Sequence, residues 1–195
     1  IVKYGLTFLF VQSEFGLCCP LSMTDSLTRT LTKFGDKKLI EKFFDQLTSQ
    51  DLDHLFQGAM FMTEQHAGSD VGSIDTYAEY EDGNWFLTGD KWFCSNPDAD
   101  LAMVLARHNK TISGTKGLAL FLLPKKLENG NQNNYEIIRL KDKLGGRSFA
   151  SGEIKLNRAF AYLVGDPDEG FKQMTDMINM SRLSNGVRAS GMMQR

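Results

Sequence analysis

The chain lacks the features that mark membrane-spanning, disulfide-stabilised and nucleic-acid-binding proteins. No apolar run approaches the about 20 residues that a membrane-spanning helix needs. The formal net charge is only −2, so there is neither a global basic signature for nucleic acid nor an acidic tail. The three cysteines form no CxxC pair and no even-numbered framework, which fits a reducing, cytoplasmic compartment. A 195-residue chain with 42% hydrophobic residues can nevertheless bury a sizeable core in one or two domains.

The two ends of the chain have the pattern of a fragment. The sequence starts at Ile1 without an initiator Met, and it stops at Arg195 within a helical pattern. We therefore expect a piece of a longer protein, in which targeting signals would not be visible.

The hydrophobic periodicity changes twice along the chain. Residues 1–57 have helical spacing, with Leu27, Leu31 and Phe34 on one face, Gly35 as a stop and Asp36 as the cap of a further helix. Short apolar or alternating runs then predict strands, and helical spacing returns at residue 168. The predicted strands are 59–62, 74–80, 85–93, 101–106, 118–123, 135–140 and 152–156. The pattern predicts an α+β fold with a compact antiparallel β-barrel or sandwich between helical segments.

Two short stretches enclose a predicted β-hairpin. They are MFMTEQHAGSDVG at residues 60–72 and KWFCSN at residues 91–96, and Asp82-Gly83 between them is a strong hairpin-turn signal. Both stretches should therefore lie at strand ends on the same side of one sheet. There they would offer backbone N–H groups, hydroxyls and an aromatic face to a planar, hydrogen-bonding ring. The alternative is an ordinary hairpin in which Trp92 and Phe93 belong to the core.

The two stretches together resemble the flavin-contacting segments of the acyl-CoA dehydrogenase family, which usually have the patterns M/V-T-E-x-x-x-G-S-D and K-x-W-I-T/S-N. The runs CPLSMT, KWFCSNP and LKDKLGGRSFASGEI are similar to the AidB-like alkylation-response branch. The resemblance implies three parts: the end of an N-terminal helical domain at 1–57, a middle β domain at 58–165, and the start of a C-terminal helical domain at 166–195.

The same resemblance implies an activity. Family members bind FAD and carry out α,β-dehydrogenation of acyl-CoA thioesters in fatty acid metabolism, with hydride transfer to flavin N5. They pass electrons to an electron-transfer acceptor and are commonly homotetramers. The alternative from another class is a flavin-containing, DNA-associated alkylation-stress protein with little dehydrogenase turnover.

The resemblance also assigns site residues. The flavin-contacting positions are Met60, Phe61, Met62, Thr63, Gly68, Ser69, Trp92, Phe93, Cys94 and Ser95. Trp92 would lean on the ring, and Ser95 would donate toward N5, with the Cys94 thiol as the weaker alternative. The substrate-contacting positions are Ser69, Asn179 and Arg182. One branch of the family has its catalytic glutamate at the position of Ser181, so the base is expected beyond Arg195.

Other polar residues leave alternatives open. Glu64 and Asp70 could form an acid/base pair, although Asp70 is more typical of a residue that hydrogen-bonds its own turn. The three histidines (His54, His66 and His108) show no ligand spacing, are expected at the surface, and predict no metal site. A basic run could be a solvated strand edge, or it could meet the cofactor pyrophosphate, the coenzyme A phosphate or nucleic acid; its members are Arg139, Lys141, Lys143 and Arg147.

Overall fold

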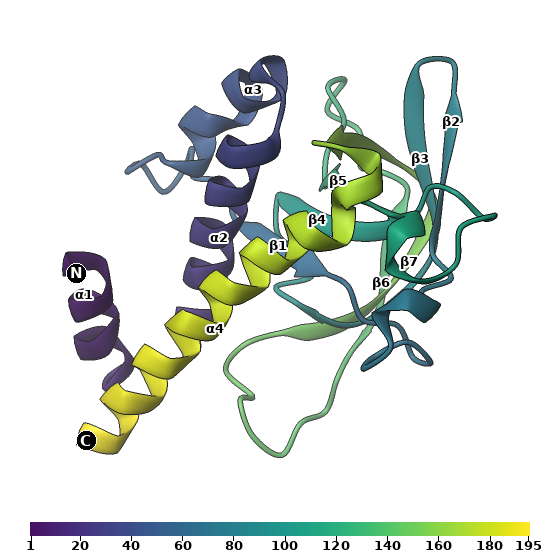
Figure 1. Ribbon diagram of the computed structural model, residues 1–195. Helices are drawn as coiled ribbons and strands as arrows, with labels where there is room; N and C mark the ends of the chain where they lie inside the picture. Colours follow the sequence, from purple (N-terminus) through teal and green to yellow (C-terminus); the bar gives the residue numbers. More distant parts are fainter.

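The computed structural model describes residues 1–195 and confirms the α+β class, with helices first, a sheet in the middle and a long helix at the end (Figure 1). The helices are α1 (Val2–Val11), α2 (Cys18–Phe34), α3 (Lys37–Leu47) and α4 (Gly170–Gln194). The strands are β1 (Gly58–Phe61), β2 (Tyr77–Glu81), β3 (Asn84–Ser95), β4 (Leu101–Arg107), β5 (Leu118–Pro124), β6 (Tyr135–Leu140) and β7 (Ser151–Val164). Three short 3₁₀ helices complete the set: η1 (Val71–Ser73), η2 (Gly114–Gly117) and η3 (Pro167–Glu169).

The strands close into a barrel. Pairings run from β1 to β4, β5, β7 and β3 and return from β3 to β1, while β2 and β6 attach to the outside of β3 and β7. One apolar cluster, which includes Phe61, Leu87 and Phe121, fills the interior. A second cluster joins the outer face of β4 and β5 to α2, α3 and α4. Figure 1 shows α4 running from the barrel across α2 to α1.

The expected hairpin and helix cap are confirmed. Strands β2 and β3 pair with Glu81 opposite Asn84, so only Asp82 and Gly83 form the turn. Both turn residues have positive φ, 49° and 82°, as a two-residue turn with the twist of the sheet requires. The Asp36 carboxylate accepts a hydrogen bond from Leu39 N at 2.8 Å, which is the predicted capping contact.

The last predicted strand was too short. The sequence predicted residues 152–156, whereas β7 continues to Val164. Its second half pairs with β3 at Phe86 and with β5 at Leu122. These partners lie far away in the chain, and local periodicity does not encode them. Likewise residues 74–76, predicted as part of a strand, follow η1 and precede β2.

The polar loop at residues 129–134 is not wholly solvated, because Asn133 is buried. Its amide nitrogen donates to Pro124 O at 2.7 Å and to Phe160 O at 2.8 Å. Its amide oxygen accepts from Phe160 N at 3.0 Å. Asn133 therefore ties the connection after β5 to the middle of β7.

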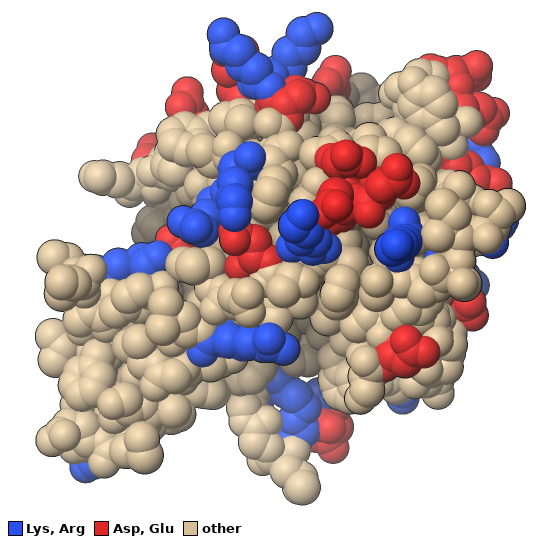
Figure 2. Space-filling model, viewed as in Figure 1, with Lys and Arg blue, Asp and Glu red and all other residues tan.

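Acidic and basic side chains are mixed on the surface shown in Figure 2. On the face in Figure 2, acidic and basic side chains are interspersed over the upper half, and the lower left, over α1, is largely uncharged. None of the helices is both long and apolar enough to span a membrane.

Candidate functional site

The two motif stretches meet, as the sequence predicted. Trp92 N donates to Thr63 O at 2.7 Å, and Met60 on β1 pairs with Ser95 on β3. The hairpin between them folds back, so that Thr63 and Trp92, 29 positions apart, and Met60 and Ser95, 35 positions apart, become backbone partners. One edge of the barrel therefore carries both stretches.

A buried ion pair fastens the two stretches together. Lys91 Nζ lies 2.7 Å from Glu64 Oε1, and the two side chains are 0% and 3% exposed. The ammonium also donates to Met62 O at 3.2 Å, while Asp75 N and Thr76 N donate to the carboxylate at 2.8 and 3.1 Å. Burial opposes the charged carboxylate, but Lys91 and these donors outweigh it and hold the pKa of Glu64 below its usual value.

Glu64 and Asp70 consequently do not form an acid/base pair here. Both oxygens of Glu64 accept hydrogen bonds within the protein. The Asp70 carboxylate accepts from Gly72 N at 3.1 Å and from the Ser73 hydroxyl at 2.5 Å, so it stabilises its own turn. Sequence reasoning missed the partnership of Lys91 with Glu64. The sequence did contain a signal for this pair, because the first stretch carries the acidic Glu64 and the second carries the basic Lys91.

A β-bulge shapes the aromatic part of the site. The pairing of β3 with β7 shifts between Lys91 and Cys94, and Phe93 has a φ of +56°. Bulges re-aim side chains and are common beside functional sites. This one leaves the Phe93 side chain 60% exposed. A large aromatic held outward at positive φ is available to cover a ligand.

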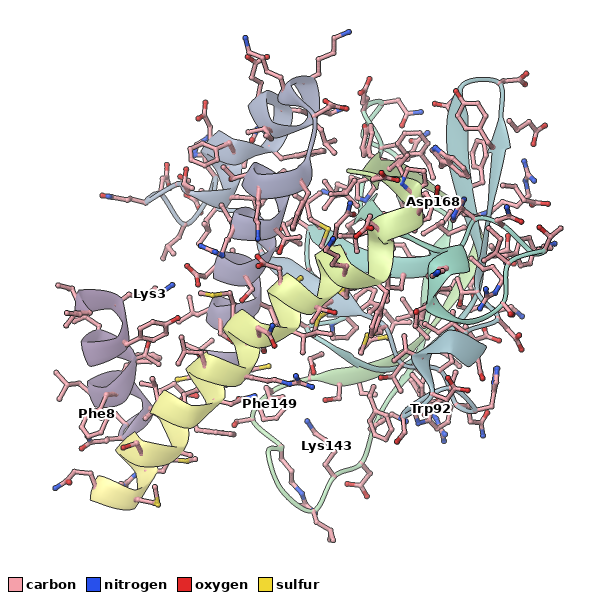
Figure 3. All side chains as sticks on the ribbon, viewed as in Figure 1. Lys3, Phe8, Trp92, Lys143, Phe149 and Asp168 are labelled. Atoms are coloured by element: carbon pink, nitrogen blue, oxygen red, sulfur yellow. The ribbon has the colours of Figure 1, made fainter.

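Trp92 packs against two cations of the basic run. Lys141 Nζ lies 3.4 Å from the centroid of its ring, and the Arg139 guanidinium lies 5.8 Å away. One face of the indole is therefore already covered by cations of this chain. The same Lys141 Nζ lies 4.3 Å from the centroid of the Phe93 ring, so this ammonium contacts both aromatic side chains. That Trp92 leans on a bound ring stays a prediction. Figure 3 shows Trp92 at the end of the barrel nearest the 141–150 loop.

Cys94 and Phe61 turn their side chains into the barrel core, where they are 0% and 1% exposed. Burial raises the pKa of the Cys94 thiol to about 12. A thiol in that position cannot donate to a ligand outside the barrel, so the alternative of Cys94 in place of Ser95 is wrong. For Phe61, only the backbone remains able to contact a ligand.

Three hydroxyls at the site are uncommitted. Thr63 and Ser95 are partly buried, Ser69 is exposed, and none of the three makes a side-chain hydrogen bond within the chain. A Cβ placed on Gly68 would meet only Thr63 Cγ2, at 3.9 Å. The chain itself thus does not require glycine there, and the space beside Gly68 is open to a ligand. These features suit a planar ring with several hydrogen-bonding atoms.

The basic run is largely engaged in internal contacts. Arg139 Nε and Lys141 Nζ lie 2.8 and 2.7 Å from the two oxygens of Glu153. Lys143 Nζ donates to Phe149 O at 2.6 Å. The Phe149 ring packs against the Phe15 ring at a tilt of 58°, with centroids 5.7 Å apart, and Figure 3 places Phe149 beside α4. The run therefore secures the 141–150 loop instead of forming an open cationic strand edge.

The two substrate candidates on α4 are exposed. Asn179 borders a cavity of about 750 Å³ with Lys33 and Asp176, and Arg182 makes no ion pair. No hydrogen bond joins either residue to the motif stretches. No group of three or more His, Cys, Asp and Glu side chains is placed to hold a metal ion. His108 departs from the predicted surface position, because its side chain is only 12% exposed beside Asp168.

Known proteins share both the sequence and the shape of this chain. Residues 59–159 match the family described as acyl-CoA dehydrogenase, middle domain. Acyl-CoA dehydrogenase family member 11 of Caenorhabditis elegans is 39% identical over 96% of this chain and 32% of its own length. Putative acyl-CoA dehydrogenase AidB of Escherichia coli is 36% identical over all of this chain and 37% of its own length. The chain thus spans about a third of these relatives.

Solved structures agree with this relationship. The structure of C. elegans ACDH-11 in complex with C11-CoA superposes with a TM-score of 0.89 at 37% identity, over 97% of this chain and 33% of that one. Butyryl-CoA dehydrogenase from Megasphaera elsdenii superposes with a TM-score of 0.83 at 25% identity, over 95% of this chain and 47% of that one. The matched domain, the identities and the shared fold together show that this chain belongs to the acyl-CoA dehydrogenase family.

Proposed function

We propose that this chain is the central part of an FAD-dependent acyl-CoA dehydrogenase that removes two hydrogens across the α,β-bond of an acyl thioester. The observation that carries the proposal is the joined edge of β1 and β3, with its free hydroxyls and outward Phe93. When bound there, the flavin supplies the acceptor for the hydride that leaves the β-carbon.

The residues of this chain would bind and orient. Ser95 and Thr63 supply hydrogen-bond donors to ring heteroatoms, Phe93 excludes water from one face, and the Glu64–Lys91 pair keeps the two stretches in register. Preorganised donors of this kind cost no rearrangement during the reaction. Ser181 cannot abstract an α-proton unaided, and Glu64 is held by Lys91, so neither is the base that the reaction needs.

The proposed partners are those that the family resemblance implies. We propose an acyl-CoA substrate, which the C11-CoA complex of ACDH-11 supports, together with an electron-transfer acceptor and further copies of the chain. A cytoplasmic location is part of the proposal, and the free thiols of Cys18, Cys19 and Cys94 support it. The DNA-associated alternative has less support, because Arg139 and Lys141 of the basic run are already paired with Glu153.

Anaerobic titration of the natural full-length protein with acyl-CoAs tests the proposal. Bleaching of the flavin absorbance at a catalytic rate is expected, and Ser95→Ala should weaken flavin retention or shift its reduction potential. Loss of a partly buried hydrogen-bond partner costs about 1–3 kcal/mol. Ser113→Ala, on an exposed loop serine, is the matched control. A protein that binds flavin but is not bleached by any acyl-CoA contradicts the proposal.

A further inference from the structure

The bulge in β3 sets two aromatic residues opposite one carboxylate. The pairing of β3 with β7 shifts between Lys91 and Cys94. Trp92 and Phe93 therefore share a single opposing residue on β7, which is Glu153. Two residues against one is the count that defines a β-bulge. The Glu153 side chain is only 10% exposed, so the residue opposite the aromatic pair is a carboxylate that is largely shielded from water.

Glu153 holds two cations from the far side of β7. Arg139 on β6 is its strand partner, and Arg139 Nε lies 2.8 Å from Glu153 Oε2. Lys141 follows directly after β6, and its Nζ lies 2.7 Å from Glu153 Oε1. The hydrogen bond from Arg139, aided by Lys141, holds the pKa of Glu153 below its usual value. Two cations thus meet one ionised carboxylate, and this cluster of three residues has an excess of positive charge.

Lys141 is the member of the cluster that touches both aromatic rings. Its Nζ lies 3.4 Å from the centroid of Trp92 and 4.3 Å from the centroid of Phe93. Its backbone N donates to Ser151 O at 2.8 Å, and its side chain is only 11% exposed. Lys141 is therefore fixed by its backbone and by its side chain, unlike a solvated strand-edge lysine. Water screens the charge of such a shielded ammonium less than that of an exposed one.

We propose that Lys141 is a positioning residue of the flavin site: it holds the rings of Trp92 and Phe93 and places the excess positive charge of the cluster against them, which raises the reduction potential of the bound flavin. The inference rests on the proposed function, because it takes these two rings as part of the flavin site. Reduction adds negative charge to a flavin ring, and protein charges near the ring tune its electronics. A fixed positive charge nearby favours the reduced form.

The charge of Glu153 acts in the opposite sense. A negative charge in the same cluster favours the oxidised flavin, so removal of Glu153 should raise the potential that removal of Lys141 lowers. A purely structural ion pair behaves differently, because loss of either partner frees the same aromatic rings. The sign of the two shifts therefore separates an electrostatic role of Lys141 from a structural one.

Potentiometric titration of the natural full-length protein loaded with FAD measures both shifts. In Lys141→Met the ratio of reduced to oxidised flavin at a fixed potential should fall about tenfold, which for a two-electron couple is about 30 mV. In Glu153→Gln the ratio should rise by a similar factor. Lys141→Arg keeps the charge and should stay near the unaltered protein. Lys38→Met, at an exposed lysine of α3, is the matched control and should leave the potential unchanged.

Shifts of the same sign in Lys141→Met and Glu153→Gln, or an unchanged potential in either variant, would overturn the proposal. If Lys141→Met does not retain flavin, the other two variants decide. A raised potential in Glu153→Gln with an unaltered one in Lys141→Arg then supports the proposal, and any other pair of results overturns it. A full-length protein that holds no flavin defeats the proposed function as well, whereas flavin retained at one common potential in all variants defeats this inference alone.

Discussion

Glu64→Gln should destabilise the protein strongly, although it alters a side chain by one atom and one charge. Glu64 is the counter-ion of Lys91, whose side chain is fully buried. Removing one partner of a buried ion pair costs about 3–5 kcal/mol, because the remaining charge is left in a dry environment. The amide also cannot accept from Asp75 N and Lys91 at once. Burial lowers the pKa of Lys91, so loss of the proton from an unpaired Lys91 would relieve part of this cost.

Urea unfolding of the 195-residue chain, followed by circular dichroism, measures this loss. For a chain of this size, about 3–5 kcal/mol corresponds to a fall in Tm of about 6–20 °C. Glu41→Gln is the matched control, because Glu41 forms an exposed pair with Lys37 (64% and 89% exposed), where removal should cost less than about 0.5 kcal/mol. The double variant Glu64→Leu with Lys91→Met should recover much of the lost stability. A cost below about 1 kcal/mol for Glu64→Gln would refute the reasoning.

Two further outcomes follow from the same contacts. The pKa of Glu64 is lowered in the folded chain, so its contribution to the free energy of unfolding is complete above the unfolded pKa of about 4.3 and is lost as pH falls through the lower folded pKa. As pH falls through this range, the stability of the unaltered chain should therefore decrease more steeply than that of Glu64→Gln. Parallel acid-unfolding curves would contradict this. Asn133→Ala leaves Phe160 N and two carbonyls without their partner and should cost about 3 kcal/mol in urea unfolding. The exposed neighbour Asn131→Ala should cost far less, and equal losses in both variants would rule out the structural role of Asn133.

Features that depend on residues close together in the chain could be predicted from the sequence. The turn at Asp82-Gly83 and the cap at Asp36 depend on neighbours within a few residues, and both are present as predicted. The meeting of the two motif stretches followed from the hairpin between them, because a two-residue turn fixes the strands on either side. The α+β class followed from the change in hydrophobic period, which is also a local property.

Long-range contacts decided the remaining features. The extent of β7 depends on β3 and β5, the burial of Asn133 depends on Phe160, and the covering of Trp92 depends on Lys141. The inward turn of Cys94 and the outward turn of Phe93 follow from a bulge that one strand alone does not reveal.

Arg188 shows most clearly how tertiary packing sets the environment of a side chain. In the sequence it is one more basic residue on a polar helix, and such side chains are mostly solvated. Only the packing of α4 against its neighbouring helices removes water from the guanidinium. Sequence by itself determined which groups this protein carries and which elements they occupy. Tertiary structure decided which of those groups are dry, paired or free, because burial and pairing depend on residues far apart in the chain.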